Sequence, residues 1–316
     1  MALFIALGCI GSGHVASAEP PGSRPVLHGR DLSSQLVGPA AAGLGARSEH
    51  PSVDIRDGKA YPFLRRIETN GRYDGLDVRG PHLLAEGVAF TGPLDIETRL
   101  PLVLRGVSVR THTTAHWAIH TRPGSAPVFI LWSSVGAAST AGAPQDRSHA
   151  LARGLYLRSD RVTVYRSHIH HAADGIQIHA RGARIVETLI DGLTFWQGDH
   201  NDGVQMLGQG GDVEIVRSRI VNANAQTSCL NLVADRVRVE ASYLAGGGWT
   251  VYAGGHQKGF LPGSARDVVF RDNIFGRDSF PKSGSFGAIT GWDRNGTGIV
   301  WQRNRWSDGA LLEVAR

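Results

Sequence analysis

The stretch Val162-Thr163-Val164-Tyr165-Arg166-Ser167-His168-Ile169 decides the fold of this chain. Apolar side chains alternate along it, a small polar residue follows, and one more apolar residue completes the unit. The same frame returns with its small polar residue at positions 133, 167, 188, 218, 242, 273 and 304. The steps between these positions are 34, 21, 30, 24, 31 and 31 residues, which is typical of a solenoid built from β-strands.

A second series of short strands lies between the copies of the first. Its members begin at Gly154, Gly175, Gly203, Cys229 and Thr250. No helical periodicity separates the two series, so we expect stacked parallel strands, with the small polar residues forming an inward ladder at a corner. The sequence therefore predicts an all-β, single-stranded parallel β-helix of roughly nine coils.

This pattern resembles the right-handed parallel β-helix proteins of the pectate-lyase-like superfamily, from about residue 80 to the end. The resemblance implies a right-handed solenoid and a carbohydrate-active protein. Members of the superfamily include polysaccharide lyases, glycoside hydrolases, uronate epimerases and phage tailspikes, and the fold alone does not choose among them.

The N-terminal residues and the composition predict where the protein is located and what kind of molecule it binds. Residues 1–18 have the apolar core and the small-residue cleavage site of a signal peptide, so we expect a secreted or periplasmic protein; a lipoprotein signal ending at Cys9 is the alternative. We expect an extended arm or cap over residues 19–51 and the β-helix domain over 52–316. The net charge of +5 favours an acidic polysaccharide over nucleic acid as the partner, and no segment of the mature chain is apolar for long enough to span a membrane.

One outward column of side chains is the predicted saccharide cleft. Alternation within the second strand series turns one residue of each strand outward, and stacked strands repeat about every 4.8 Å, close to the length of a sugar unit. The residues in this column are Tyr156, Gln177, Gln205, Asn231 and Tyr252.

Imidazoles gather in the sequence around this column. His168, His170 and His171 precede Asp174, His179 follows Gln177, and His200 precedes Asp202. Histidine titrates near neutrality, so the cluster is a candidate acid/base site, with Arg158 beside His179. The alternative is a set of surface histidines in turns.

Asp174 and Asp202 each precede a glycine in two consecutive coils. Asp-Gly is a turn signal, so both aspartates are candidates for fixing a bend. If they stack, the two carboxylates repel and one pKa rises, which is also an arrangement that a glycosidase pair can use.

Two short motifs resemble known families. Asp199-His200-Asn201-Asp202 resembles the Asp-Pro-His-Asp motif of mannuronan C5-epimerases, without its proline. Asn201-Asp202-Gly203 is similar to an element of polygalacturonases, whose paired aspartates and Arg-x-Lys element are absent here.

We predict from these features a lyase that cleaves an acidic, uronate-containing polysaccharide by β-elimination. Such a reaction needs a group that neutralises the uronate carboxylate, a base and an acid. The alternatives are a glycoside hydrolase that uses Asp174 and Asp202, a uronate C5-epimerase, and a saccharide-binding solenoid without catalysis.

The expected roles are divided among the named residues. The catalytic candidates are His200, His179 and Lys258 as bases, Tyr252 as acid, and Asp174 and Asp202. The substrate-binding candidates are Gln177, Gln205, Asn231, Arg158, Tyr156 and His170. No cofactor is required, and a calcium ion held by Asp174, Asp199 and Asp202 is the alternative means of neutralising the substrate.

Overall fold

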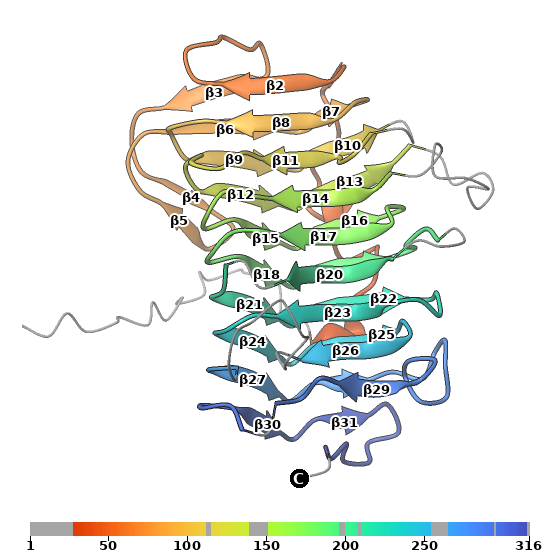
Figure 1. Ribbon diagram of the computed structural model, residues 1–316. Coiled ribbons are helices and arrows are strands. Elements are labelled where there is room, and N and C mark those ends of the chain that lie inside the picture. Colours follow the sequence, from red (N-terminus) through yellow and green to blue (C-terminus); the bar gives the residue numbers. More distant parts are fainter. Residues whose placement is uncertain are drawn as a thin grey trace, which may run out of the picture.

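The protein is a parallel β-helix. The computed structural model describes residues 28–111, 115–138, 151–195, 200–207, 210–253, 265–293 and 295–314. Three long sheets run the length of the molecule and wrap around one core, as Figure 1 shows. The predicted all-β, parallel β-helix fold is confirmed, while the expected signal peptide at residues 1–18 lies outside the described residues.

The three sheets are named here after their first strands. The β1 sheet contains β1 (Ser48–His50), β7 (Val88–Phe90), β10 (Ser108–Thr111), β13 (Ser134–Ala137), β16 (His168–His170), β19 (Leu189–Asp191), β22 (Arg219–Asn222), β25 (Tyr243–Gly246), β28 (Ile274–Phe275) and β31 (Arg305–Trp306). The β2 sheet contains β2 (Val53–Arg56), β8 (Leu94–Glu97), β11 (Ile119–Thr121), β14 (Arg153–Leu157), β17 (Asp174–Ile178), β20 (Asp202–Leu207), β23 (Ser228–Val233), β26 (Trp249–Ala253) and β29 (Gly287–Thr290). The β3 sheet contains β3 (Leu64–Ile67), β6 (His82–Glu86), β9 (Leu102–Arg105), β12 (Val128–Leu131), β15 (Thr163–Tyr165), β18 (Arg184–Val186), β21 (Val213–Val216), β24 (Val237–Glu240), β27 (Val268–Arg271) and β30 (Val300–Gln302).

Each complete coil visits the β3 sheet, then the β1 sheet, then the β2 sheet. Neighbouring strands within these sheets are parallel, except that β3 runs antiparallel to β6 at the N-terminal end. A small hairpin of β4 (Gly71–Tyr73) and β5 (Leu76–Val78) stands outside the three sheets. Inward-facing aliphatic side chains of all coils form one continuous core.

The predicted polar ladder occupies the corner between the β3 and β1 sheets. The Ser218 hydroxyl accepts a hydrogen bond from the Thr188 backbone N–H, 3.2 Å away, and donates to the carbonyl of Val216 in its own coil. Ser242 accepts from Ser218 N at 3.1 Å, and Asn273 accepts from Ser242 N at 3.0 Å. These side chains are fully buried, so the ladder satisfies backbone groups that no solvent reaches.

The residue before each ladder position makes the bend. Trp132, Arg166, Arg217 and Asp272 all have positive φ angles, between 47° and 58°. A single residue in this left-handed conformation turns the chain from one sheet to the next, although none of these four is a glycine.

The N-terminal arm, residues 28–47, lies along the outside of this corner. Its backbone N–H groups donate to the carbonyls of three bend residues: Gly29 to Ala241, Gly38 to Arg166, and Arg47 to Gly87. The arm contains a 3-10 turn, η1 (Gly29–Asp31), and one short helix, α1 (Gly38–Ala41). It therefore crosses the coils in the direction opposite to their order in the sequence, and the first strand begins at Ser48.

A buried ion network lies beside the arm. Arg166 Nε donates to Glu187 Oε2 at 2.5 Å, and Arg217 Nε donates to Glu187 Oε1 at 3.1 Å. The Arg166 and Glu187 side chains are at most 4% exposed. Leu32 and Val37 of the arm pack with Leu189 of β19. The arm thus helps to enclose charges that an open corner would leave in water.

Aromatic side chains close the C-terminal end of the core. Trp301 stacks on Phe270 with ring centroids 5.7 Å apart and donates from Nε1 to the carbonyl of Leu312 at 2.7 Å. Within the part of the chain that the structure describes, no helix has the length and apolar character needed to cross a membrane.

Candidate functional site

The predicted column is present on the outer side of the β2 sheet. Tyr156 pairs with Gln177, Gln177 with Gln205, Gln205 with Asn231, and Asn231 with Tyr252. The five side chains therefore lie on five successive strands, β14, β17, β20, β23 and β26, as the alternation in the sequence predicted.

The column is open to solvent only towards its ends. Tyr156, Gln177 and Tyr252 are half-buried, whereas Gln205 is 9% and Asn231 7% exposed. The expectation of a continuous solvent-facing row is thus wrong at its centre, because these two amides turn toward a buried carboxylate.

That carboxylate belongs to Asp202, which has no exposed surface. Gln205 Nε2 donates to Asp202 Oδ2 at 2.8 Å, Asn231 Nδ2 approaches the same oxygen at 3.5 Å, and the Ser228 hydroxyl donates to Oδ1. Burial raises the pKa of Asp202 above its usual range, and these hydrogen bonds oppose the rise. Gln177 donates to Gln205, and Arg153 donates to Gln177, so one hydrogen-bonded chain joins the buried centre to the surface.

Close stacking of successive coils explains why the second residue of both β17 and β20 is a glycine. A Cβ on Gly175 would lie 2.5 Å from the carbonyl oxygen of Gly203, and one on Gly203 would lie 2.5 Å from that of Cys229. In front of these glycines, Asp174 Oδ1 accepts a hydrogen bond from the Asp202 backbone N–H at 3.0 Å. This contact favours the turn-fixing interpretation of Asp174. The pKa of Asp202 is raised, as predicted for one carboxylate, but by burial.

Two further catalytic candidates, Tyr252 and His200, lie near the buried Asp202 carboxylate. Burial, and then the negative charge of Asp202, raise the pKa of Tyr252. His200 is exposed, at the connection that enters β20. Lys258 and Asp199 lie outside the described residues.

The other end of the column gathers an aromatic and cationic cluster around Tyr156. His179 meets the Tyr156 ring edge-on with centroids 5.4 Å apart, and His120 stacks on it at 5.1 Å. The guanidinium carbons of Arg153 and Arg158 lie 5.0 and 5.8 Å from its centroid. Arg158 and His179 directly follow the paired residues Leu157 and Ile178, so they are neighbours, as expected. Arg158 is exposed and forms no ion pair with any other described residue.

Sequence reasoning missed Trp117, His120 and Arg153 in this cluster. Trp117 contacts both His120 and Tyr156, at centroid distances of 4.6 and 5.9 Å. The strand of His120 lacks the glycine that marks the later strands, so only its place after Ala118-Ile119 could have indicated the register.

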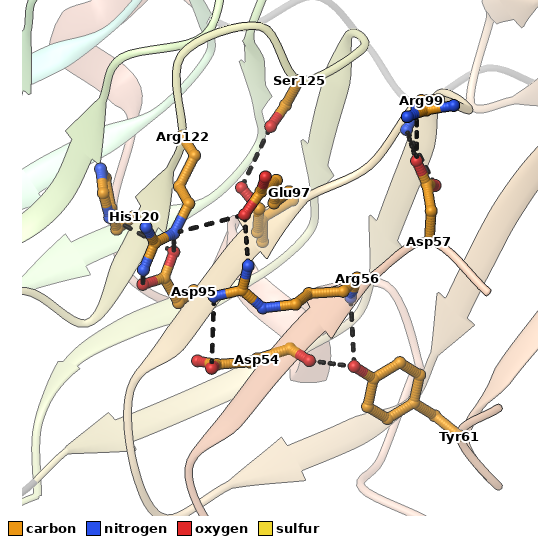
Figure 2. A network of polar contacts seen from close by, with 11 residues as sticks. Asp54, Arg56, Asp57, Tyr61, Asp95, Glu97, Arg99, His120, Arg122 and Ser125 are labelled. Carbon is orange, nitrogen blue, oxygen red and sulfur yellow. Dashed lines mark hydrogen bonds and ion pairs between the residues drawn. The ribbon is translucent and has the colours of Figure 1, made fainter. Parts of the chain in front are cut away.

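Toward the N-terminus the charged side chains of the same face form ion pairs with one another, as Figure 2 shows. Asp95 pairs with His120 in register and accepts two hydrogen bonds from Arg122, at 2.7 and 2.6 Å. Arg56 is hydrogen-bonded to Glu97 at 2.5 Å. Burial lowers the pKa of His120, against the influence of Asp95. Arg158, by contrast, forms no ion pair with any carboxylate in the described part of the chain.

The histidines named from the sequence divide between two walls. His179 directly follows β17 and belongs to the Tyr156 cluster, but His168 and His170 lie on β16 in the β1 sheet. The prediction that His170 borders the column is wrong, because the chain turns a corner between His170 and Asp174.

Of the three proposed calcium ligands, Asp199 lies outside the described residues. Both carboxylate oxygens of Asp202 accept hydrogen bonds from N–H or O–H donors of the protein, and one oxygen of Asp174 accepts a hydrogen bond from the Asp202 backbone N–H. Among the residues that the structure describes, no cluster of three or more His, Cys, Asp or Glu side chains could hold a metal.

No family model, curated protein or solved structure matches the chain.

Proposed function

We propose that this protein is a secreted or periplasmic lyase that cleaves a uronate-containing polysaccharide by β-elimination at the Tyr156 cluster. The observation that carries the proposal is the convergence of Arg158, His179 and Tyr156 at the ends of two neighbouring strands, with Gln177 paired to Tyr156. We also propose that the protein is related to the pectate-lyase-like superfamily, which its sequence resembles.

Each requirement of the reaction has a candidate in this cluster. Arg158 neutralises the uronate carboxylate and the Gln177 amide donates a hydrogen bond to it, which makes the proton at C5 more acidic. His179 removes that proton as general base. The Tyr156 hydroxyl donates a proton to the leaving glycosidic oxygen at C4 as that bond breaks, and a C4–C5 double bond remains.

This assignment changes the acid expected from the sequence. Tyr252 lies three strands beyond β17, which at about 4.8 Å per strand places it about 14 Å along the column from His179. That distance is too long for one sugar unit to reach both groups. Tyr252 instead fits contact with a sugar further along the polymer, because the β2 sheet is long enough to hold several units.

The Asp174 and Asp202 pair supports a hydrolase less well. A glycosidase needs two carboxyl groups that reach the scissile bond, and Asp202 is fully buried with its oxygens occupied. Its hydrogen bonds instead hold Gln205, and through it Gln177, in position.

The test is incubation of the purified protein with a panel of polyuronates and their neutral counterparts, with ultraviolet absorbance to detect unsaturated ends. We expect absorbance to rise with a polyuronate only. His179→Ala should lower the rate about 10²- to 10⁴-fold, as loss of a general base does. Tyr156→Phe should lower it strongly while leaving the ring contacts in place.

Tyr165→Phe is the matched control, because Tyr165 lies on β15 in the β3 sheet, away from the cluster. Reducing ends without unsaturation would select a hydrolase, and deuterium uptake at C5 without cleavage would select an epimerase. Saccharide binding that His179→Ala leaves unchanged, with no turnover on any polymer, would leave a binding solenoid and overturn the proposal.

A further inference from the structure

The imidazoles outside the Tyr156 cluster form a separate polar group on the outer face of the β1 sheet. His168 and His170 of β16 lie between Ser134 of β13 and Asp191 of β19. His168 Nε2 is 2.7 Å from Asp191 Oδ1, and the rings of His168 and His170 are 4.5 Å apart. This group shares no residue with the proposed lyase site.

Ser134, His170 and His171 form a hydrogen-bonded relay. Ser134 Oγ lies 2.9 Å from His170 Nε2, and His170 Nδ1 lies 2.6 Å from His171 Nδ1. Only one hydrogen fits between the two Nδ1 atoms. When His170 supplies it, His170 Nε2 is left as an acceptor for the Ser134 hydroxyl.

The backbone makes room for this arrangement. Gly136 pairs with His170 in register, and a Cβ on Gly136 would lie 2.6 Å from His170 Nδ1. Any other residue at position 136 would therefore displace the ring. His171 directly follows the strand with a φ of 52°, so its side chain leaves the sheet beside His170.

The surroundings hold His170 in the neutral form and place a cation next to it. Burial, and then the positive charges of His168 and His171, lower the pKa of His170 to about 3; Asp191 opposes this and Arg110 adds to it. Arg110 pairs in register with Gly136, is exposed, and has no ion-pair partner among the described residues. A nucleophile, a base, an orienting group and a positive charge thus occupy one surface.

We propose that Ser134 is the nucleophile of a second site that hydrolyses carboxylic esters. The Ser134 oxygen attacks the ester carbonyl while its proton passes to His170 Nε2. The alcohol leaves with that proton, and the acyl group remains on Ser134. Water then attacks the acyl-serine, gives its proton to His170, and the carboxylic acid is released as Ser134 recovers its proton. Arg110 stabilises the negative charge on the carbonyl oxygen.

A serine-directed fluorophosphonate probe tests this site independently of lyase activity. A base with a pKa far below neutrality accepts a proton weakly, so we expect slow turnover of p-nitrophenyl acetate but stoichiometric labelling by the probe. Ser134→Ala should abolish both. His170→Gln and Arg110→Ala should each slow labelling at least tenfold.

Ser108→Ala is the matched control, since Ser108 pairs with Ser134 one coil earlier. It should label like the unmodified protein, and peptide mapping should find the adduct on Ser134. Circular dichroism and thermal unfolding should be unchanged in Ser134→Ala. Absence of labelling in the unmodified protein, or equal labelling in Ser134→Ala, would overturn the proposal whatever happens with polyuronates.

Discussion

His170 shows how one side chain can make the stability of the whole chain depend on pH. Its pKa is lowered to about 3 in the folded protein, against about 6.5 for a free imidazole. Between these values the unfolded chain binds one more proton at this residue than the folded chain does. His170 therefore causes no loss of stability above about pH 6.5. Its protonation in the unfolded chain lowers the free energy of unfolding progressively as the pH falls toward 3.

His170→Gln should flatten this dependence. One proton corresponds to about 1.4 kcal/mol per pH unit, so urea unfolding at a series of pH values from 4 to 7 should show a slope smaller by up to that amount. The exposed His116 provides the matched substitution, His116→Gln. Identical slopes for the unmodified protein and His170→Gln would show that another group carries the dependence.

The polar ladder makes a prediction at the level of the element. Ser218→Ala removes the only hydrogen-bond acceptor that the structure records for the buried backbone N–H of Thr188. An unsatisfied buried donor costs about 1–3 kcal/mol, so the free energy of unfolding should fall by about that amount. Denaturant titration measures it, with the exposed Ser285→Ala as control. A change below a few tenths of a kcal/mol would mean that the ladder does not stabilise the corner.

The arm makes a second prediction at this level. Deleting residues up to Arg47 leaves the carbonyls of Gly87, Arg166 and Ala241 without their arm donors and uncovers the Arg166–Glu187 pair. We expect far-ultraviolet circular dichroism of the β-helix to persist, the unfolding temperature to fall, and hydrogen exchange to quicken at β16, β19 and β25. An unchanged unfolding temperature would show that the arm adds nothing to the solenoid.

At the scale of the whole molecule, the solenoid could be predicted because its signals are local and repeated. Each coil carries its own apolar alternation and its own ladder residue, so Ser167 and Ser218 could be placed without knowing any long-range contact. The column from Tyr156 to Tyr252 followed from the same period. An arm or cap before the β-helix was expected, but no such rule predicts where the arm docks, since its contacts use backbone groups and a few apolar side chains.

The candidate site was only partly predictable for related reasons. Proximity in sequence placed His170 beside the column, yet a corner separates it from that wall. Alternation predicted the direction of Gln205 and Asn231 but could not show that Asp202 draws them inward. Trp117 and His120 enter from a coil whose strand lacks the repeated glycine, so no pattern joined them to Tyr156.

The path of the arm also has a consequence for synthesis. Gly29 leaves the ribosome early, but its partner carbonyl on Ala241 emerges only after most of the coils have been made. Coils can stack on one another as they appear, whereas this leading segment has to wait. Its docking thus requires the chain to have been made at least as far as Ala241, and a molecule whose translation stops short of that residue has no anchor for Gly29.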